Sequence, residues 1–487
     1  MKKKIVVVGG GFGGLASAAL LGKQGYDVTL LEKNEAVGGR ASVLKKKGFT
    51  FDMGPSWYLM PDVFDRFYGL FDAKPSDFLK LKRLDPNYRV FFGTNDYADI
   101  KAKFEDNLPF FEKIDPGVTP HLKSYLKQSQ ENYEVSKRFI YHQYDSVFDF
   151  FNKDLINEKP DIRLFGRLDK YLARYIKNER LQKILAYSMV FLGGSPSNTP
   201  GLFSIMSHID FNLGVYYPMG GIYEVIRSLQ TLCDRYGVKI LTNQNVKKIN
   251  VDNGTATTVI TDKKSFVADE VVVNADYQFA ETQLLDPQWQ TYNKSFWSKR
   301  TVAPSAFIMY LGVKRKVQNL KHHTLLFDHD WEQHFNEIFD NPMWPENPSY
   351  YVCCPSKTDS SVAPKGMENL FILVPIASGL KDTAAMRKKY GNKMLAHLTG
   401  ILGDDFRKDI VVQETFGISD FEERYNAYKG TALGLTQTFF QSTIFRPRNK
   451  SKKVNNLYYT GQYTIPGIGM PMCLVSAELV VDKIVNG

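Results

Sequence analysis

The distribution of apolar and polar residues predicts three elements at the start of the chain. Residues 5–8 are four consecutive β-branched residues, a pattern typical of a strand buried in a parallel sheet. Residues 15–21 have the composition of a helix, which Gly25 would end. Residues 28–31 predict a second strand. The first 60 residues are therefore expected to form a β-α-β unit followed by a loop.

The predicted secondary structure changes twice in the middle of the chain. Residues 61–190 are mostly helical in pattern, apart from an irregular aromatic segment at 88–111. Residues 216–236 predict a Gly-Gly turn and a helix, and short strands separated by Asn, Asp and Gly follow. Two further strands are expected at 300–313 and 369–377.

The last 30 residues return to the pattern of the first. Residues 457–460 predict a strand, a turn containing Gly461, Gly467 and Gly469 follows, and a helix begins near Met472. This second glycine-rich turn indicates that one domain is assembled from segments at both ends of the chain. Two separate nucleotide sites are the alternative.

Composition narrows the classes of function. The chain has 487 residues, 43% hydrophobic and 14% aromatic, which predicts two to four structural units with a large core. Its net charge of +10 includes no Lys/Arg block and no nucleic-acid motif, so we expect no nucleic-acid partner. A modest positive excess does suit an anionic membrane surface. No apolar run is long enough to cross a bilayer.

Cysteine and histidine spacing argues against a metal site. The four cysteines form no CxxC, and the eight histidines form no HExxH. The one suggestive pair is His322-His323, where we do not expect a metal. The sequence therefore predicts reduced thiols in the cytosol and no metal ion.

The glycines at residues 9–14 are the clearest chemical signal. Gly9-x-Gly11-x-x-Gly14 directly follows the first strand and opens the helix. Gly9 allows a tight turn, Gly11 lets the backbone approach a pyrophosphate, and Gly14 lets helix and strand pack closely. The helix N-terminus then offers N–H groups to phosphates. The alternative, a signal peptide ending at Ala16-Ser17-Ala18, conflicts with glycines inside its apolar stretch.

Two further features extend the nucleotide motif. Glu32 ends the second strand, 18 residues after Gly14, which is close to the spacing of a carboxylate that binds a ribose hydroxyl. Gly38-Gly39-Arg40 follows. These two glycines would let the chain pass close to a diphosphate, whose charge the arginine could meet with paired donors.

The combined pattern resembles the FAD signature of the amine-oxidase and glutathione-reductase-like flavoproteins. Beyond it, the chain is similar to the bacterial-type carotenoid desaturases, the phytoene and diapophytoene desaturase family. The segments that carry this resemblance are "FTFDMGPS" (49–56), "YPMGGIYEVIRSL" (217–229), "HHTLLF" (322–327), "TDSSVAPKG" (358–366), "QSTIFRP" (441–447) and "NLYYTGQYTIPGIGMP" (456–471).

The resemblance implies an α/β fold with a discontinuous FAD-binding Rossmann domain. This domain would comprise residues 1–70, 220–290 and 440–487. Residues 71–219 and 291–439 would form a mixed α+β substrate domain, with 118–190 helical and membrane-facing. The predicted cofactor-binding residues are Gly9, Gly11, Gly14, Glu32, Gly38, Gly39, Arg40, Gly54, Pro55, Ser56, Val246, Gly461, Gln462, Ile468 and Met470.

The chemistry implied by the resemblance is desaturation of a carotenoid precursor such as phytoene or diapophytoene. A hydride would pass from a saturated carbon to flavin N5, and a proton would leave the neighbouring carbon. Because a polyene lacks hydrogen-bonding groups, its pocket should be long and apolar. No base is identified; Asp145 and Asp149 fit helix-capping or surface roles better. The alternatives are a related flavoprotein acting on another lipid or an amine, and a non-catalytic carotenoid-binding protein.

Two local features qualify the resemblance. Ile465 stands where the family usually has histidine, which puts in doubt any histidine role beside the flavin. Residues 162–176 place basic and apolar residues on opposite faces of a predicted helix. Such a helix could lie on the anionic inner face of the membrane, as in a peripheral, monotopic cytoplasmic enzyme. Its alternative is an ordinary surface helix with its apolar side in the core.

Overall fold

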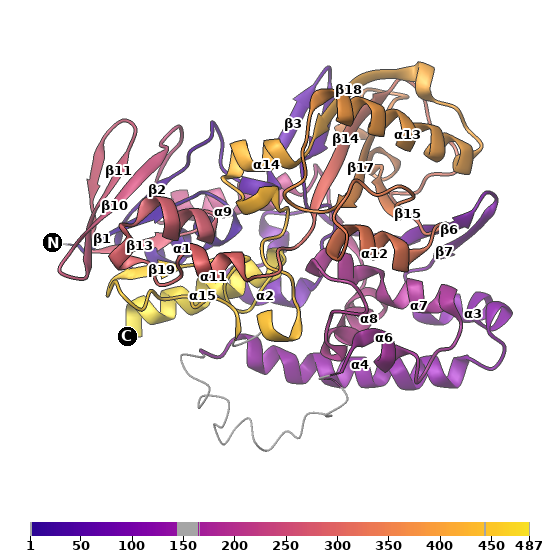
Figure 1. Cartoon of the computed structure of the whole chain (residues 1–487), viewed down its shortest axis with the longest axis horizontal. Coiled ribbons are helices and arrows are strands. Elements are labelled where there is room, and N and C mark those ends of the chain that lie inside the picture. The colour runs from indigo at the N-terminus through magenta and orange to yellow at the C-terminus, as the bar shows by residue number, and fades with distance from the viewer. Residues whose placement is uncertain (1, 144–163, 165, 443–444, 487) are drawn as a thin grey trace.

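A five-stranded parallel sheet gathers both ends of the chain (Figure 1). The computed structural model describes residues 2–143, 164, 166–442 and 445–486. The two ends of the chain lie beside the same sheet. In spatial order its strands are β19 (Leu457–Tyr459), β13 (Glu270–Val273), β1 (Lys4–Val8), β2 (Asp27–Leu31) and β9 (Lys239–Leu241).

Strand β1 is buried on both faces, as its uninterrupted β-branched sequence predicts. Ile5 and Val7 join a core shared with three helices, whereas Val6 and Val8 face a second core on the other side of the sheet. The three helices are α1 (Phe12–Lys23), α9 (Tyr223–Arg235) and α15 (Met470–Asn486). Because α15 packs beside α1, the predicted α/β class with a discontinuous Rossmann domain is confirmed.

A mixed seven-stranded sheet forms the second half of the molecule. Its strands alternate their side chains between the large aromatic core and a core shared with helix α13 (Ala384–Leu402). In spatial order they are β18 (Ile410–Phe416), β14 (Ser305–Val313), β17 (Glu368–Ile376), β16 (Tyr350–Cys353), β15 (His323–Leu326), β6 (Tyr88–Gly93) and β7 (Asp96–Ile100).

Strands β6 and β7 correct the expectation of an irregular aromatic segment at 88–111. They form an antiparallel hairpin, and β6 also pairs in parallel with β15. The pairing places Val90 opposite Leu325, more than 200 residues further along the chain. Local periodicity does not reveal so distant a partner, so the segment looked irregular in the sequence.

Helices cluster below this sheet in the view of Figure 1. They include the longest helix of the described residues, α4, which lies along the lower edge of the molecule. Their bounds are α3 (Leu108–Ile114), α4 (Thr119–Ile140), α6 (Leu168–Leu172), α7 (Glu179–Ala186) and α8 (Ile205–His208). Helix α2 (Pro61–Gly69) packs instead beside α15.

The predicted continuous helix over 162–176 is wrong. Within the described part of this range only α6 is α-helical, because Arg167 forms an isolated β-bridge with Pro200 and a turn follows Leu172. Leu168 and Leu172 are buried, whereas Lys170 is exposed. The apolar side of α6 therefore packs in the core, as the alternative interpretation held.

The remaining strands form three smaller sheets. One is a three-stranded antiparallel sheet of β10 (Val246–Asp252), β11 (Thr255–Thr261) and β12 (Ser265–Val267). The others are the hairpin of β3 (Val43–Lys46) and β4 (Phe49–Asp52), and a pair of β5 (Leu81–Arg83) and β8 (Tyr216–Pro218) from distant parts of the chain. The remaining helices are α10 (Tyr277–Phe279), α11 (Lys294–Ser298), α12 (Trp331–Phe339) and α14 (Ile418–Tyr425). Among the described residues, no helix combines the length and apolarity that crossing a bilayer requires.

The contact between α1 and β1 yields a stability prediction. A Cβ atom at Gly14 would lie 2.0 Å from the Gly9 carbonyl oxygen, so Gly14→Ala must push the helix away from the sheet. We expect it to lower the free energy of unfolding by about 3 kcal/mol or more. Gly69→Ala is the control, because a Cβ there meets nothing within 4 Å. Equal melting temperatures for the two variants would contradict the close packing assigned to Gly14.

Candidate functional site

One cavity of about 540 Å³ lies at the carboxyl ends of the parallel strands and extends toward the seven-stranded sheet. All predicted cofactor-binding residues except Gly14 and Gly461 line it. These two glycines lie next to cavity-lining residues and allow close packing behind them. Gly14 holds α1 against Gly9, and a Cβ atom at Gly461 would lie 2.6 Å from the side-chain amide of Asn274.

The glycine-rich turn presents backbone donors to the cavity. Gly9 has a φ of 99°, a left-handed conformation that favours glycine. Helix α1 starts at Phe12, and its N-cap residue Gly11 supplies no side-chain hydrogen bond. The first N–H groups of the helix are therefore available to a ligand, and the helix dipole favours an anion there.

Glu32 is held at the other side of this turn. Its carboxylate accepts a hydrogen bond from the Gly10 N–H at 2.8 Å and from the Asn34 N–H at 2.8 Å. The residue is 5% exposed and lines the cavity. The structure thus fixes an acceptor at the end of β2, where the sequence predicted a ribose-binding carboxylate.

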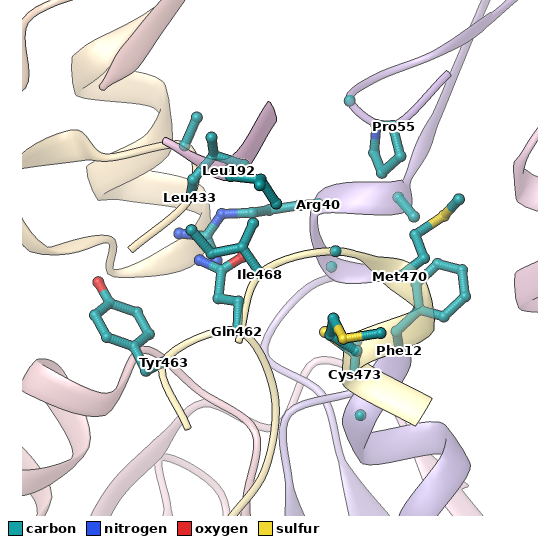
Figure 2. Close-up of a pocket in the computed structure, with 18 of the residues that line it drawn as sticks. Phe12, Arg40, Pro55, Leu192, Leu433, Gln462, Tyr463, Ile468, Met470 and Cys473 are labelled. Atoms are coloured by element: carbon teal, nitrogen blue, oxygen red, sulfur yellow. The ribbon is translucent and has the colours of Figure 1, made fainter. Parts of the chain in front are cut away.

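Arg40 and Gln462 bring polar groups from opposite ends of the chain into one place. In Figure 2 the Arg40 side chain extends from the N-terminal ribbon toward Gln462 and Leu433. Arg40 donates to the Thr431 carbonyl at 3.1 Å, but its buried Nε has no partner among the described residues. The buried Gln462 Nε2 likewise has none there. Both residues line the cavity and are donors suited to an anionic ligand.

Gly54, Pro55 and Ser56 form the segment that follows β4. A Cβ atom at Gly54 would lie 2.4 Å from the Arg40 carbonyl oxygen, so only glycine allows this close passage. The Ser56 hydroxyl lies 2.9 Å from that of Tyr351 on the seven-stranded sheet. This segment therefore joins the glycine-rich region to the second half of the molecule.

Two polar residues after strand β13 were missed in the sequence. Asn274 donates from its side chain to the Thr460 carbonyl at 2.9 Å, and so links the ends of β13 and β19. Asp276 lines the cavity and accepts a hydrogen bond from the Tyr463 hydroxyl at 2.6 Å. Burial raises the pKa of Asp276 above its usual value, although Tyr463 and Arg40 oppose this. The sequence did offer one signal for a binding role of Asn274 and Asp276, namely their position at the carboxyl end of a parallel strand.

A buried arginine supports the C-terminal side of the cavity. Arg446, 2% exposed, donates to the Gln437 side chain at 3.0 Å and to the carbonyls of Gln441, Thr464 and Gln462. Burial lowers the pKa of its guanidinium to about 9, so it is still charged at pH 7. It therefore holds the loop that carries Gln462 and Ile468.

Ile465 does not lie in the cavity wall. It packs with Val63 and with Val475 and Leu479 of α15 in a separate apolar cluster, while the neighbouring Pro466 and Ile468 line the cavity. Ile465 therefore packs behind the loop that carries Pro466 and Ile468. Asp145 and Asp149 lie outside the described residues.

Beyond Ser56 the cavity becomes an apolar lobe. Aromatic and aliphatic side chains from both halves of the molecule line it, with few charged groups. They include Trp57, Leu59, Met60, Tyr187, Val190, Leu192, Leu202, Phe203, Ile205, Met206, Ile209, Ala306, Ile308, Leu325, Phe327, Trp331, Phe335 and Leu373. The same cavity thus joins a donor-rich end to an apolar end.

Comparison with known proteins identifies the family. A family model of flavin containing amine oxidoreductases matches residues 12–485. A carotenoid 3,4-desaturase of Haloarcula japonica is 46% identical over 484 residues, 99% of this chain and 98% of that protein. The chain belongs to the carotenoid desaturase family. A zeta-carotene-forming phytoene desaturase of Myxococcus xanthus is 32% identical over 489 residues, with 99% and 94% of the two chains covered.

Other comparisons agree with this family. A 4,4'-diapophytoene desaturase of Staphylococcus aureus is 32% identical over 501 residues, with 99% of each chain covered. Among solved structures, an oxidoreductase from Methanosarcina mazei has a TM-score of 0.67 at 18% identity, covering 99% of this chain and all of that chain. Putrescine oxidase bound to putrescine has a TM-score of 0.63 at 13% identity, with both chains fully covered. These two likenesses show the fold alone.

The donor-rich end of the desaturase cavity fits a flavin nucleotide. The uncapped first turn of α1 and the Arg40 Nε and Gln462 Nε2, which have no partner among the described residues, all donate, as a diphosphate requires. The backbone at the glycines packs so closely that a side chain at any of them would fill part of the cavity or displace the cavity wall. The residues present therefore match the flavin that defines the family.

This fit predicts a specific loss on mutation of Arg40. We expect Arg40→Ala to weaken flavin binding by about 10- to 100-fold, because it removes a charge-assisted donor to the diphosphate. The loss of affinity is measured as the amount of flavin that the protein retains through gel filtration and as the flavin dissociation constant. Arg407→Ala is the control, since Arg407 pairs with Asp405 on the surface and does not line the cavity. Flavin affinity unchanged in Arg40→Ala would contradict the assignment.

Proposed function

We propose that the protein binds FAD and catalyses desaturation of a carotenoid precursor such as phytoene or diapophytoene. The observation that carries this proposal is that one cavity joins the glycine-rich, donor-rich end to an apolar lobe. A flavin and a polyene need these two environments side by side. The names of the three similar desaturases support the same reaction type.

FAD, which carries an adenosine half, would use residues of the polar end that a shorter flavin would not reach. Glu32 and Val246 line the cavity near the ends of β2 and β10, beyond the glycine-rich turn. A carboxylate there can accept from ribose hydroxyls, and the Val246 backbone can face an adenine. Arg40 and Gln462 would meet the diphosphate and the ribityl chain.

The side chains of the lobe would position the substrate and exclude water. Bound flavin supplies the hydride acceptor. Ile468 and Met470, at the N-terminus of α15, would orient the polyene against it. Because the lobe is lined by rings and aliphatic groups, alignment of a hydrocarbon there rests on shape and dispersion contacts rather than hydrogen bonds. No basic side chain is assigned to the departing proton.

A carotenoid precursor dissolves in lipid, so the enzyme must meet a membrane. An exposed aromatic cluster suits that contact: Phe439, Phe440 and Phe445 are 38%, 69% and 45% exposed, and their rings contact one another. They follow Leu433 and Gln437, which line the cavity. We infer peripheral binding to the anionic inner face of the membrane from the cytoplasmic side, with this cluster inserted at the interface.

The desaturation reaction predicts reduction of the bound flavin by substrate. Under anaerobic conditions, phytoene or diapophytoene in detergent should bleach the visible flavin absorbance, and conjugated product should appear. Leu202→Trp, which narrows the lobe, should slow bleaching at least about tenfold without loss of flavin. Leu213→Trp is the control, because Leu213 is partly buried nearby but does not line the cavity. Flavin that stays oxidised with either polyene in the wild type would contradict the proposal.

The cofactor itself is identified by release. Heat-denatured protein should release FAD and not FMN, detected by chromatography of the supernatant. A colourless protein that takes up no added FAD would remove the basis of the proposed reaction.

The membrane surface is tested with vesicles. Replacing Phe440 and Phe445 with serine should weaken binding to vesicles of phosphatidylglycerol and phosphatidylcholine by about tenfold per ring, because each ring loses its apolar transfer energy. Val267→Ser is the control, an equally exposed apolar residue on strand β12, 65% exposed. Co-sedimentation at low and physiological salt measures binding. Wild-type protein that remains in the supernatant at both salt concentrations would exclude this attachment.

A further inference from the structure

Three potential metal ligands meet at the outer wall of the apolar lobe. Asp328 and His329 follow strand β15, and His397 lies on helix α13. Their ligand atoms all lie within 4.8 Å of one another. Asp328 Oδ2 is 2.8 Å from His397 Nε2 and 3.6 Å from His329 Nε2. Two elements distant in the sequence therefore bring one carboxylate and two imidazoles to a single point.

Asp328 has an oxygen that the described residues leave unsatisfied. Its side chain is 9% exposed, and its buried Oδ1 has no hydrogen-bond partner among the residues that the structure describes. A buried carboxylate oxygen without a partner is costly, because it has given up its water. A cation placed between the three side chains would restore that interaction.

The surroundings prepare the histidines to act as ligands. The Tyr350 hydroxyl lies 2.8 Å from His397 Nδ1, so that nitrogen can donate to Tyr350 while Nε2 keeps its lone pair. The His329 and His397 side chains are 29% and 22% exposed, which gives an ion access from solvent.

We propose that Asp328, His329 and His397 bind one divalent late first-row metal ion, best matched by Zn²⁺. Two imidazole nitrogens and one carboxylate oxygen are a borderline donor set that Zn²⁺ accepts in tetrahedral geometry, with water as the fourth ligand. Ligand atoms in such a site are about 3.3 Å apart, so the cluster needs only small side-chain shifts. The ion would sit between His397 Nε2 and Asp328 Oδ2, where these two atoms now contact each other.

The position of the site gives the ion a structural role. Phe327 and Trp331 flank the Asp328-His329 pair and line the apolar lobe, as does Tyr350. An ion that ties this segment to α13 would fix the wall that these three rings form. The positive charges of Lys183 and Lys393 oppose the ion and limit its affinity. This site differs from the sequence expectation of no metal, which rested on the spacing of cysteines and histidines along the chain.

Titration of tag-free, flavin-loaded, full-length protein tests the proposal. After dialysis against chelator, calorimetry with Zn²⁺ should give one ion per chain, and Co²⁺ should give visible absorption bands of a nitrogen- and oxygen-bound ion. Saturating Zn²⁺ should raise the melting temperature by about 3 °C. His397→Gln should weaken binding at least about tenfold and abolish the Co²⁺ bands, with flavin content unchanged.

Matched variants separate this site from others. His121→Gln, an exposed histidine on α4, should bind Zn²⁺ as the wild type does. Tyr350→Phe should weaken binding about tenfold, because it keeps the ligands and removes only their hydrogen-bond partner. No uptake by the wild type, or equal uptake by wild type and His397→Gln, would overturn the proposal. Binding lost in Cys353→Ser but kept in His397→Gln would instead place the ion at the buried His322, His323 and Cys353 trio, and would equally overturn it.

Discussion

The side-chain amide of Asn274 is the contact on which the nucleotide end of the cavity depends. Its backbone N–H donates to the Val8 carbonyl at 2.7 Å, and its side chain donates to that of Thr460. Cβ atoms at Gly11, Gly13 and Gly461 would lie 2.6 to 2.8 Å from this amide. The glycines therefore serve protein packing as well as nucleotide access, because they let one amide tie three distant segments together.

This constraint explains why one cavity can serve a charged cofactor and a hydrocarbon. Once the ends of β1, β13 and β19 are fixed, Arg40 and Gln462 line the same cavity as Phe12 in the first turn of α1. The opposite wall comes from the seven-stranded sheet, whose inward-facing side chains include Ala306 and Ile308. The donors thus lie at the end of the five-stranded sheet, and apolar groups come from the seven-stranded sheet. Each sheet can therefore keep an apolar core of its own.

The sequence predicted the parts of the fold that local signals encode. Strand β1, the turn at Gly9 and helix α15 follow from residue spacing and from backbone geometry that only glycine allows. The hairpin of β6 and β7 could not be predicted in this way, because its partner strand β15 is remote in the chain. Basic residues do recur at helical spacing over 162–176. Because Arg167 forms a β-bridge with Pro200, the described α-helix in this range is limited to the short α6.

The site could be predicted only where chemistry and geometry coincide along the chain. Arg40 was found because two glycines precede it, whereas Asp276 gave no such local signal. Ile465 shows what the sequence could not reveal: at a family position that usually holds histidine, its side chain packs against Val63 and α15. Since an isoleucine in that cluster contributes apolar packing and does not reach the cavity, its replacement of histidine alters the support behind the cofactor loop rather than the reacting surface.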